Sequence, residues 1–349
     1  MRLLRLLDRP DAVLISRSPL SDTANWGDYD RAAQQALSAL RVEIDAGENV
    51  VFKPNVTVGE KYADPDTGIT THPGFVQGAA EYVLDHGARR GHVYILEDPR
   101  NTNDNEDRHW RDTGYPDVRA ATGAKLRCPK TYTCVKRPVP SPLVRPELNV
   151  SRLATAPNTV LVNVPKLKTH NLGITTLCMK NLMGVVKVME RHYCSQAWQE
   201  MPPEVRDDER PRAEWLTRDL HEMWQAGLAR RLIDLAKVVR PRLNLVEGVI
   251  AREGTGFNRG RNRALGLCIA GVNMVAVDSV ASYLMGFDPR ELVYLRLAAE
   301  AGLGTNDIAR LDLYEVVEGE VVPCRDIASL RADPPLKVIS NIKGEDVTF

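Results

Sequence analysis

The chain has 349 residues, 43% of them hydrophobic and 26% charged, which is typical of a globular protein with a substantial core. Its 46 basic and 46 acidic residues balance, so a sequence-independent nucleic-acid binder, which normally has a basic excess, is disfavoured. No apolar run approaches the length of a membrane span, and the six scattered cysteines contain no CxxC pair. We therefore expect a cytoplasmic protein without a membrane partner, a disulfide framework or a zinc knuckle.

Strands and helices are predicted to alternate from the start of the chain. Residues 12–15 and 50–52 form short apolar runs, and residues 30–44 between them carry alanine and leucine at helical spacing. The second strand runs directly into Lys53-Pro54-Asn55. Open α/β sheets bind ligands at the carboxyl ends of parallel strands, so Lys53 and Asn55 are candidate binding residues. A solvated strand end is the alternative explanation for Lys53.

The segment Thr70-Thr71-His72-Pro73 introduces a predicted helix over residues 74–86, with proline suited to the first turn. Free amides at a helix N-terminus attract anions, which makes Thr71 and His72 candidate anion-binding residues. Simple capping by either side chain is the alternative.

Residues 93–97 predict a further strand, which ends in Glu97-Asp98. The polar stretch 100–113 follows, and we expect its His109 and Trp110 to pack at the surface. Residues 125–146 contain several prolines among short β-like runs, which is typical of an irregular hairpin or a sheet edge.

Residues 159–186 carry the most informative pattern. The continuous apolar run 160–164 predicts a strand buried on both faces, and Pro165 ends its ladder. Lys166, Lys168 and His170 then follow at spacing two, so their side chains share one side if this segment is extended.

A second apolar run contains Lys180 and Asn181. Charged and amide groups are costly to bury in such a run unless they are paired. A strand followed by an amphipathic helix with solvated lysines would explain a single lysine. The clustering of three lysines, a histidine and an asparagine favours a site.

Residues 213–239 predict a long helix, on which we expect His221 to be exposed and Asp234 to be structural. The strand 243–249 carries Glu247 and precedes a loop with Glu253, Gly254 and Gly256. The glycine spacing is not that of a dinucleotide fingerprint, and residues 264–270 look like a strand, so a Rossmann cofactor site is not supported. The glycines instead allow the backbone to approach a ligand.

A lone carboxylate, Asp278, interrupts the predicted helix 273–285, whose other residues in that region are Val, Ala and Ser. Such a group indicates a buried partner or a site.

The alternation of strands and helices predicts an α/β fold with a mainly parallel sheet, flanking helices and motif-bearing loops at the carboxyl ends of the strands. We expect one domain over residues 1–349, with peripheral insertions near 100–150 and 190–214. Two lobes around a cleft near 159–186 are the alternative.

The motifs PKLKTH at 165–170 and KNLMG at 180–184 closely resemble the signature of domain-of-unknown-function family 362. KPN at 53–55, TTHP at 70–73, EGTGFNRG at 253–260 and VAVDSVASYLMG at 275–286 match that family in the same order. The resemblance covers roughly residues 51 to 307 and implies little chemistry. The family pattern commonly has a histidine near position 192, so His192 is a candidate by position.

Some members of that family are fused to a ferredoxin-like module with dense cysteine spacing. This chain has no such spacing, so we do not expect it to hold an iron–sulfur cluster by itself. More distantly, a lysine–histidine segment after a buried strand is similar to the nickel-pincer lactate racemases.

Together these residues predict an enzyme that acts on a small anionic molecule, a carboxylate or a phosphate, as an isomerase, racemase or lyase. The assigned catalytic residues are Lys168, His170 and Lys180. The assigned substrate-binding residues are Lys53, Asn55, Thr71, His72, Lys166, Asn181, Gly254 and Gly256. The candidate ligands for a divalent metal are Glu97, His192, Glu247, Glu253 and Asp278. The alternatives are an iron–sulfur or metal-associated redox protein with a redox partner, and a non-catalytic anion-binding module.

Overall fold

Short apolar strands form most of the framework, as the hydrophobic pattern predicts. A computed structural model describes residues 6–20, 22–56, 64–99, 106–130, 133–344 and 346–347. Its strands are β1 (Ala12–Arg17), β2 (Asn49–Pro54), β3 (Val93–Leu96), β4 (Lys125–Arg127), β5 (Cys134–Pro138), β6 (Glu147–Ser151), β7 (Thr159–Val164), β8 (Lys166–His170), β9 (Ile174–Thr176), β10 (Leu243–Arg252), β11 (Asn262–Gly271), β12 (Asp312–Val317), β13 (Glu320–Pro323), β14 (Val338–Ile339) and β15 (Asp346–Val347).

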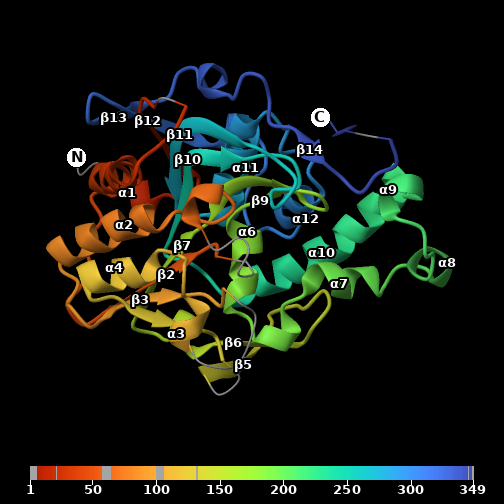
Figure 1. Cartoon of the computed structure of the whole chain (residues 1–349), viewed down its shortest axis with the longest axis horizontal. Helices are drawn as coiled ribbons and strands as arrows, with labels where there is room; N and C mark the ends of the chain where they lie inside the picture. The colour runs from red at the N-terminus through yellow and green to blue at the C-terminus, as the bar shows by residue number, and fades with distance from the viewer. Residues whose placement is uncertain are drawn as a thin grey trace.

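One 11-stranded sheet has the order β13-β12-β1-β11-β10-β7-β2-β3-β4, and β8 pairs with β10 while β9 pairs with β8 (Figure 1). Strands β4, β3, β2, β7 and β10 are parallel neighbours, whereas β11 is antiparallel to both β10 and β1. The predicted α/β fold with a mainly parallel sheet is confirmed. Because parallel strands point the same way, the segments that follow them all leave the sheet at the carboxyl ends of the strands.

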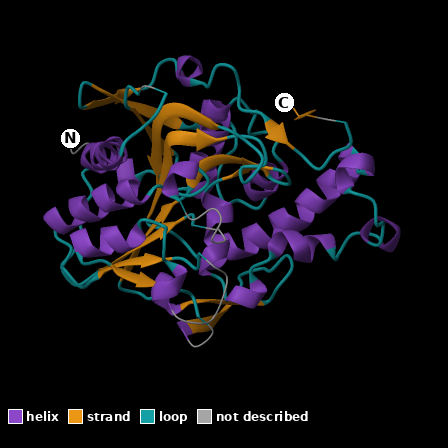
Figure 2. Ribbon diagram, in the orientation of Figure 1, coloured by secondary structure: helices purple, strands orange, loops and turns teal. Residues whose placement is uncertain are grey.

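Helices cover both faces of the sheet (Figure 2). On strand β2, Val50 and Phe52 pack in one core cluster with residues of α1 and α2, and Val51 packs in a second cluster with residues of α10 and α11. This two-sided burial explains the continuous apolar runs of the strands. The helices are α1 (Trp26–Leu40), α2 (Pro73–Asp85), α3 (Glu106–His109), α4 (Tyr115–Thr122), α5 (Arg152–Thr155), α6 (Cys178–Asn181), α7 (Tyr193–Trp198), α8 (Pro203–Arg206), α9 (Arg212–Trp215), α10 (Arg218–Val238), α11 (Met274–Met285) and α12 (Val293–Glu300).

The break at Pro165 positions the lysine-rich motif. Strand β10 is long enough to pair with β7 before this break and with β8 after it. The register between β8 and β10 then shifts, so that Lys166 lies opposite Glu247 and Lys168 lies opposite Arg252. Of these two lysines, Lys166 therefore has an acidic neighbour across the strands and Lys168 has a basic one.

Two expectations about histidines are wrong. His109 and Trp110 are buried, because α3 packs against β4 at the edge of the sheet. His221 is also buried, and its Nε2 lies 3.2 Å from the Asn171 carbonyl oxygen. A polar local sequence did not reveal either contact, since both depend on a distant segment.

Other features agree with expectation. Residues 125–146 contain β4, which ends the sheet, and the start of the separate β5–β6 hairpin. Asp234 is structural, since its carboxylate accepts backbone hydrogen bonds from Leu143, Val144 and Arg145. Among the helices in the described ranges, none combines the length and the apolar character needed to cross a bilayer.

Candidate functional site

A cavity of about 380 Å³ lies where the lysine-rich motif meets the glycine-bearing loop after β10. It contains all three residues assigned to catalysis, together with Asn55 and Gly256 from the binding set. Its lining residues are Asn55, Lys168, His170, Asn171, Thr176, Lys180, Thr255, Gly256, Phe257 and Asn258. Segments more than 200 positions apart in the chain thus meet at one place.

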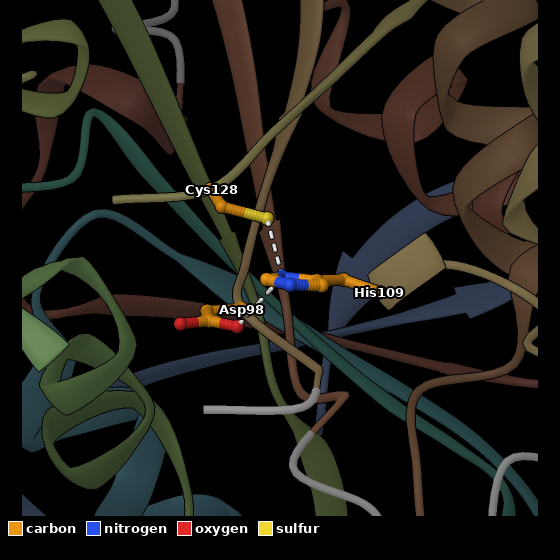
Figure 3. Close-up of side chains that lie close together, drawn as sticks. All are labelled: Asp98, His109 and Cys128. Carbon is orange, nitrogen blue, oxygen red and sulfur yellow. Dashed lines mark hydrogen bonds and ion pairs between the residues drawn. The ribbon is translucent and has the colours of Figure 1, made fainter. Parts of the chain in front are cut away.

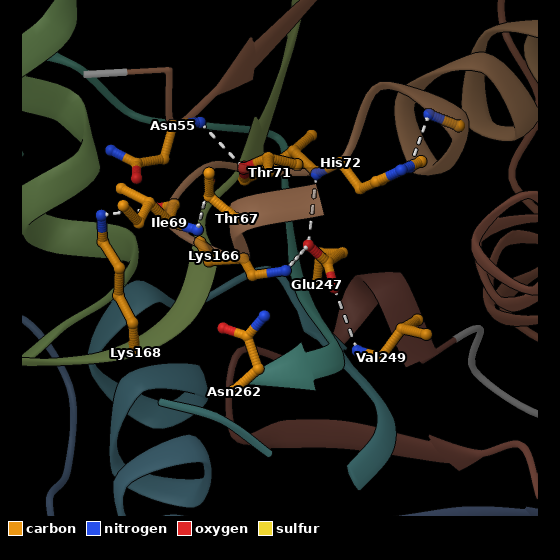
Figure 4. Close-up of polar contacts among 12 residues, drawn as sticks. Asn55, Thr67, Ile69, Thr71, His72, Lys166, Lys168, Glu247, Val249 and Asn262 are labelled. Atoms are coloured by element: carbon orange, nitrogen blue, oxygen red, sulfur yellow. Dashed lines mark hydrogen bonds and ion pairs between the residues drawn. The ribbon is translucent and has the colours of Figure 1, made fainter. Parts of the chain in front are cut away.

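Lys168 is a buried lysine of this cavity. Its side chain extends from β8, is only 7% exposed, and donates a hydrogen bond from Nζ to the Ile69 carbonyl oxygen at 2.8 Å (Figure 4). Burial lowers the pKa of Lys168 to about 7, and the neighbouring charges of Lys180, Lys166 and Arg252 act in the same direction. Lys168 therefore exists in both protonation states near neutral pH.

His170 is held as a neutral ring with a defined proton position. Its Nδ1 accepts hydrogen bonds from the backbone N–H groups of Leu172 and Gly173, each at 3.1 Å. Burial, followed by the charges of Lys180 and Lys168, lowers the pKa of His170 well below its usual value. The neutral ring must then carry its proton on Nε2, which makes that nitrogen a hydrogen-bond donor.

Lys180 reaches the cavity from α6, a single turn whose position is set by Asp278. The Asp278 carboxylate on α11 accepts hydrogen bonds from the backbone N–H groups of Cys178, at 2.7 Å, and Met179, at 3.1 Å. Burial raises the pKa of Asp278 to about 7, although these hydrogen bonds oppose the rise. Asp278 is thus a positioning residue for the turn that carries Lys180.

The loop after β10 closes the cavity through its glycines. Gly254 and Gly256 both have positive φ values, of 82° and 70°. A Cβ on Gly256 would overlap the carbonyl group of Thr169 on β8, and Thr169 Oγ1 donates to the Gly254 carbonyl oxygen at 2.9 Å. These glycines therefore permit close backbone packing against the lysine motif.

Lys53 lies outside the cavity lining, in a buried ion pair with Glu97. Its Nζ also donates to the Pro54 carbonyl oxygen at 2.7 Å. Asn181 connects this pair to the neighbouring strand, since its Nδ2 donates to the carbonyl oxygen of Lys53 and to Oδ1 of Asn163, both at 2.8 Å. Asn181 and Lys53 thus make internal contacts and are not part of the cavity lining.

Gly184, the last residue of the KNLMG motif, packs directly against the Lys53–Glu97 ion pair. A Cβ at this position would lie 2.5 Å from Cε and 2.6 Å from Nζ of Lys53, and closer still to the Glu97 carboxylate. No side chain larger than hydrogen fits there without displacing the ion pair.

Lys166 forms a second buried ion pair, with Glu247, at 2.6 Å (Figure 4). The same carboxylate oxygen accepts the backbone N–H of His72 at 3.3 Å. His72 caps α2 by accepting the Gly74 N–H on Nδ1, and its ring stacks on Tyr29 with a centroid distance of 3.7 Å. Burial lowers the pKa of His72 to about 3, with a further contribution from Lys166, so this imidazole is neutral and structural.

Thr71 is likewise committed to structure. Its Oγ1 donates to the Val164 carbonyl oxygen at 2.7 Å and accepts the Asn55 N–H at 2.9 Å. The capping alternative therefore describes His72, and a strand-bridging contact describes Thr71.

The five candidate metal ligands do not come together. Glu97 and Glu247 are held by Lys53 and Lys166, and Asp278 is held by backbone amides. The Glu253 carboxylate pairs with Arg261 and Arg263, and His192 is exposed before α7. The four carboxylates are satisfied by nearby cations or N–H groups, which sequence spacing does not reveal.

The sequence reasoning missed two sets of residues. The first consists of the cavity residues Asn171, Thr176, Thr255, Phe257 and Asn258. Three of them, Asn171, Thr255 and Phe257, are sequence neighbours of residues that were assigned. The second consists of Asp98, His109 and Cys128, whose side chains meet at the ends of β3 and β4. The position of Cys128 directly after a strand adjacent to β3 was the signal that could have found it.

A family model and one known protein each match most of this chain. A family model described as a domain of unknown function (DUF362) matches residues 50–283. The chain is also 26% identical over 281 residues to "Thylakoid-associated protein sll1697" of Synechocystis sp. (strain ATCC 27184 / PCC 6803 / Kazusa), an alignment that covers 80% of this chain and 75% of that protein. The cytoplasmic location expected for this chain stays a prediction.

Proposed function

The chain belongs to the DUF362 family, and we propose that it binds a small carboxylate or phosphate anion in the lysine-lined cavity and moves a proton to or from it, as an isomerase or lyase does. One observation carries this proposal. The motifs contain four lysines, Lys53, Lys166, Lys168 and Lys180. Of these, Lys53 and Lys166 have carboxylate partners. Lys168 and Lys180 line a cavity whose described lining contains no carboxylate, and Lys168 Nζ donates to the Ile69 carbonyl oxygen.

When both cavity lysines are protonated, a bound anion would balance their charge. They repel one another, and the neighbouring Arg252 adds to the positive charge. A bound carboxylate or phosphate would accept hydrogen bonds from both ammonium groups and from the amide and hydroxyl donors of the lining. Asn55, Asn171 and Thr176 supply such donors.

Lys168 is suited to proton transfer because an acid–base group works best when its pKa lies near the operating pH. At a pKa of about 7, neutral Lys168 can accept a proton from a bound substrate and return it in a later step. His170 has a different role, since its Nδ1 is occupied by backbone amides. Its Nε2–H would donate to an oxygen on which negative charge develops.

Anion binding is tested with sulfate, whose charge is constant between pH 5 and 9, by isothermal titration calorimetry. We expect Lys168→Met and Lys180→Met each to weaken sulfate binding by at least about tenfold, in the range of a lost charged hydrogen bond. The matched control is Lys136→Met, an exposed lysine on β5, which should not change the affinity. Affinity should also fall as the pH rises through about 7, because Lys168 loses its charge.

Proton transfer is tested separately, with a panel of compounds that spans the proposed substrate class. The protein is incubated in D₂O with small carboxylates and phosphate esters, and deuterium incorporation at carbon is measured by mass spectrometry. Exchange that depends on Lys168 supports an enzyme. Sulfate binding without exchange of any panel member would support the non-catalytic anion-binding module instead, and loss of neither in the variants would remove the cavity from both hypotheses.

A further inference from the structure

A second cluster of reactive groups follows the outermost parallel strands, beyond the Lys53–Glu97 pair. Asp98 follows β3, Cys128 follows β4 and His109 ends α3 (Figure 3). All three residues are at most 2% exposed. His109 Nδ1 lies 3.6 Å from Cys128 Sγ and 3.3 Å from Asp98 Oδ1.

Both distances have the values expected for ligands around one tetrahedral zinc ion. Zinc binds thiolate sulfur at about 2.3 Å, imidazole nitrogen at about 2.0–2.1 Å and carboxylate oxygen at about 2.0–2.2 Å. At a tetrahedral angle these bonds place sulfur and nitrogen about 3.6 Å apart, and nitrogen and oxygen about 3.3 Å apart. The three donor atoms also lie within 4.8 Å of one another, so a single ion can reach them all.

The cluster is not arranged as a nucleophile relay. In a cysteine–histidine–aspartate relay the thiol contacts one ring nitrogen and the carboxylate orients the ring through the other. Here the thiol and the carboxylate both approach Nδ1 of His109. Convergence on one nitrogen is the arrangement of ligands around a common centre.

The state of Asp98 supports a cation ligand. Its side chain is fully buried, and neither carboxylate oxygen accepts a hydrogen bond from the part of the chain that the structure describes. Its charged neighbour is Arg191, whose guanidinium lies 3.5 Å from Oδ2, beyond good hydrogen-bond range. A buried carboxylate without hydrogen bonds is costly, and a metal ion on the Oδ1 side would satisfy it.

We propose that Asp98, His109 and Cys128 form a site for a divalent transition-metal ion of the zinc type. One thiolate and one carboxylate neutralise a dication, and the mixed sulfur, nitrogen and oxygen donors suit zinc better than calcium or magnesium. Arg191 then serves as the outer partner of the ligating carboxylate. The site is independent of the lysine cavity and uses none of its lining residues.

The three ligands found among the described residues leave a fourth tetrahedral position, which in catalytic zinc sites is taken by water or an exogenous group. Cys128 also lines a separate cavity of about 380 Å³ between β3, β4 and α5. That cavity has apolar lining from Tyr94, Leu96, Leu153 and Ala156 and polar lining from Arg127, Thr133, Ser151 and Arg152.

The experiment uses Co²⁺ as a spectroscopic substitute for zinc. Full-length protein is treated with a chelator, dialysed and titrated with Co²⁺, while thiolate-to-cobalt charge transfer and the tetrahedral ligand-field bands are recorded. We expect one equivalent to bind, Zn²⁺ to displace it, and the charge-transfer band to disappear in Cys128→Ser. Cys134→Ser, a nearby cysteine outside the cluster, is the matched control and should retain the band.

Two outcomes would overturn the proposal: no stoichiometric cobalt binding to the wild-type protein, or a charge-transfer band that survives in folded Cys128→Ser. If Cys128→Ser does not fold, X-ray absorption at the zinc edge of the wild-type protein decides. One sulfur neighbour at about 2.3 Å with nitrogen or oxygen neighbours at about 2.0–2.1 Å supports the site, and zinc without a sulfur neighbour contradicts it.

Discussion

Lys166 and Lys168 lie two residues apart on the same strand, yet their cross-strand neighbours have opposite charges, one negative and one positive. Lys166 lies opposite Glu247 and forms a buried ion pair at 2.6 Å. Lys168 lies opposite Arg252, bonds only to a carbonyl oxygen among the described residues, and lines the cavity. The register shift of β10 separates these two outcomes.

The difference teaches which buried cations support the fold and which are available for chemistry. A lysine with its own carboxylate is charge-balanced without a ligand, as is Lys53 beside Glu97. A lysine next to other cations is destabilised in its charged form until an anion or a deprotonation relieves it. Lys53 and Lys166 form buried ion pairs outside the cavity lining, whereas Lys168 and Lys180 line the cavity.

The largest expected effect is on the stability of the fold, when a buried lysine loses its carboxylate partner. Glu247→Gln leaves Lys166 buried without a carboxylate, and we expect the free energy of unfolding to fall by about 3–5 kcal/mol. Urea denaturation measures it. The control Glu147→Gln, which removes the exposed partner of Lys136, should leave the stability nearly unchanged. Equal effects of both changes would contradict the distinction between buried and exposed pairs.

Lys168→Met is expected to change the pH dependence of stability by up to a few kcal/mol. The folded pKa of about 7 lies below the unfolded value near 10.4, so the folded state binds fewer protons between these values and wild-type stability rises with pH across that window. Methionine removes this rise. The advantage of the variant over the wild-type protein should therefore be greatest below pH 7 and shrink towards pH 10. Denaturation curves of both proteins at pH 6, 8 and 9.5 measure this difference in stability. A difference that does not change with pH would contradict the lowered pKa of Lys168.

Gly184→Ala tests the packing around Lys53 and Glu97. The added methyl group would collide with the ion pair, and we expect a loss of about 1–3 kcal/mol, in the range of overpacked cores. Gly47→Ala is the matched control, because a Cβ there meets no atom within 4 Å. If thermal unfolding finds the two variants equally stable, the glycine has no steric role.

The smallest expected effect lies within the cavity. Thr176→Val removes one hydroxyl donor, and sulfate affinity should fall by about three- to tenfold, in line with the ~1 kcal/mol of a typical hydrogen bond. Calorimetry measures it, with Thr155→Val on α5 as a control away from the lining. Unchanged affinity would show that sulfate does not contact β9.

Much of the framework was readable from local pattern. The apolar runs at β2, β3 and β7 predicted buried parallel strands, and Pro165 predicted the break before the lysine motif. Strand geometry also predicted correctly that charged groups would gather at strand ends. Local pattern could not distinguish a ligand-facing lysine from a paired one, because both appear as lysine after an apolar run.

That distinction depends on contacts across the fold. The register shift of β10 determines that Lys166 lies opposite Glu247 and Lys168 opposite Arg252. The packing of α6 next to Lys53 places the Asn181 amide in an internal hydrogen bond. The approach of α3 to β4 brought His109 to Asp98 and Cys128, and the one local signal was the position of Cys128 directly after a strand. Residue type and periodicity are local properties and specify strands and helices, whereas the pairing of buried charges depends on distances between distant segments, which only the folded chain sets.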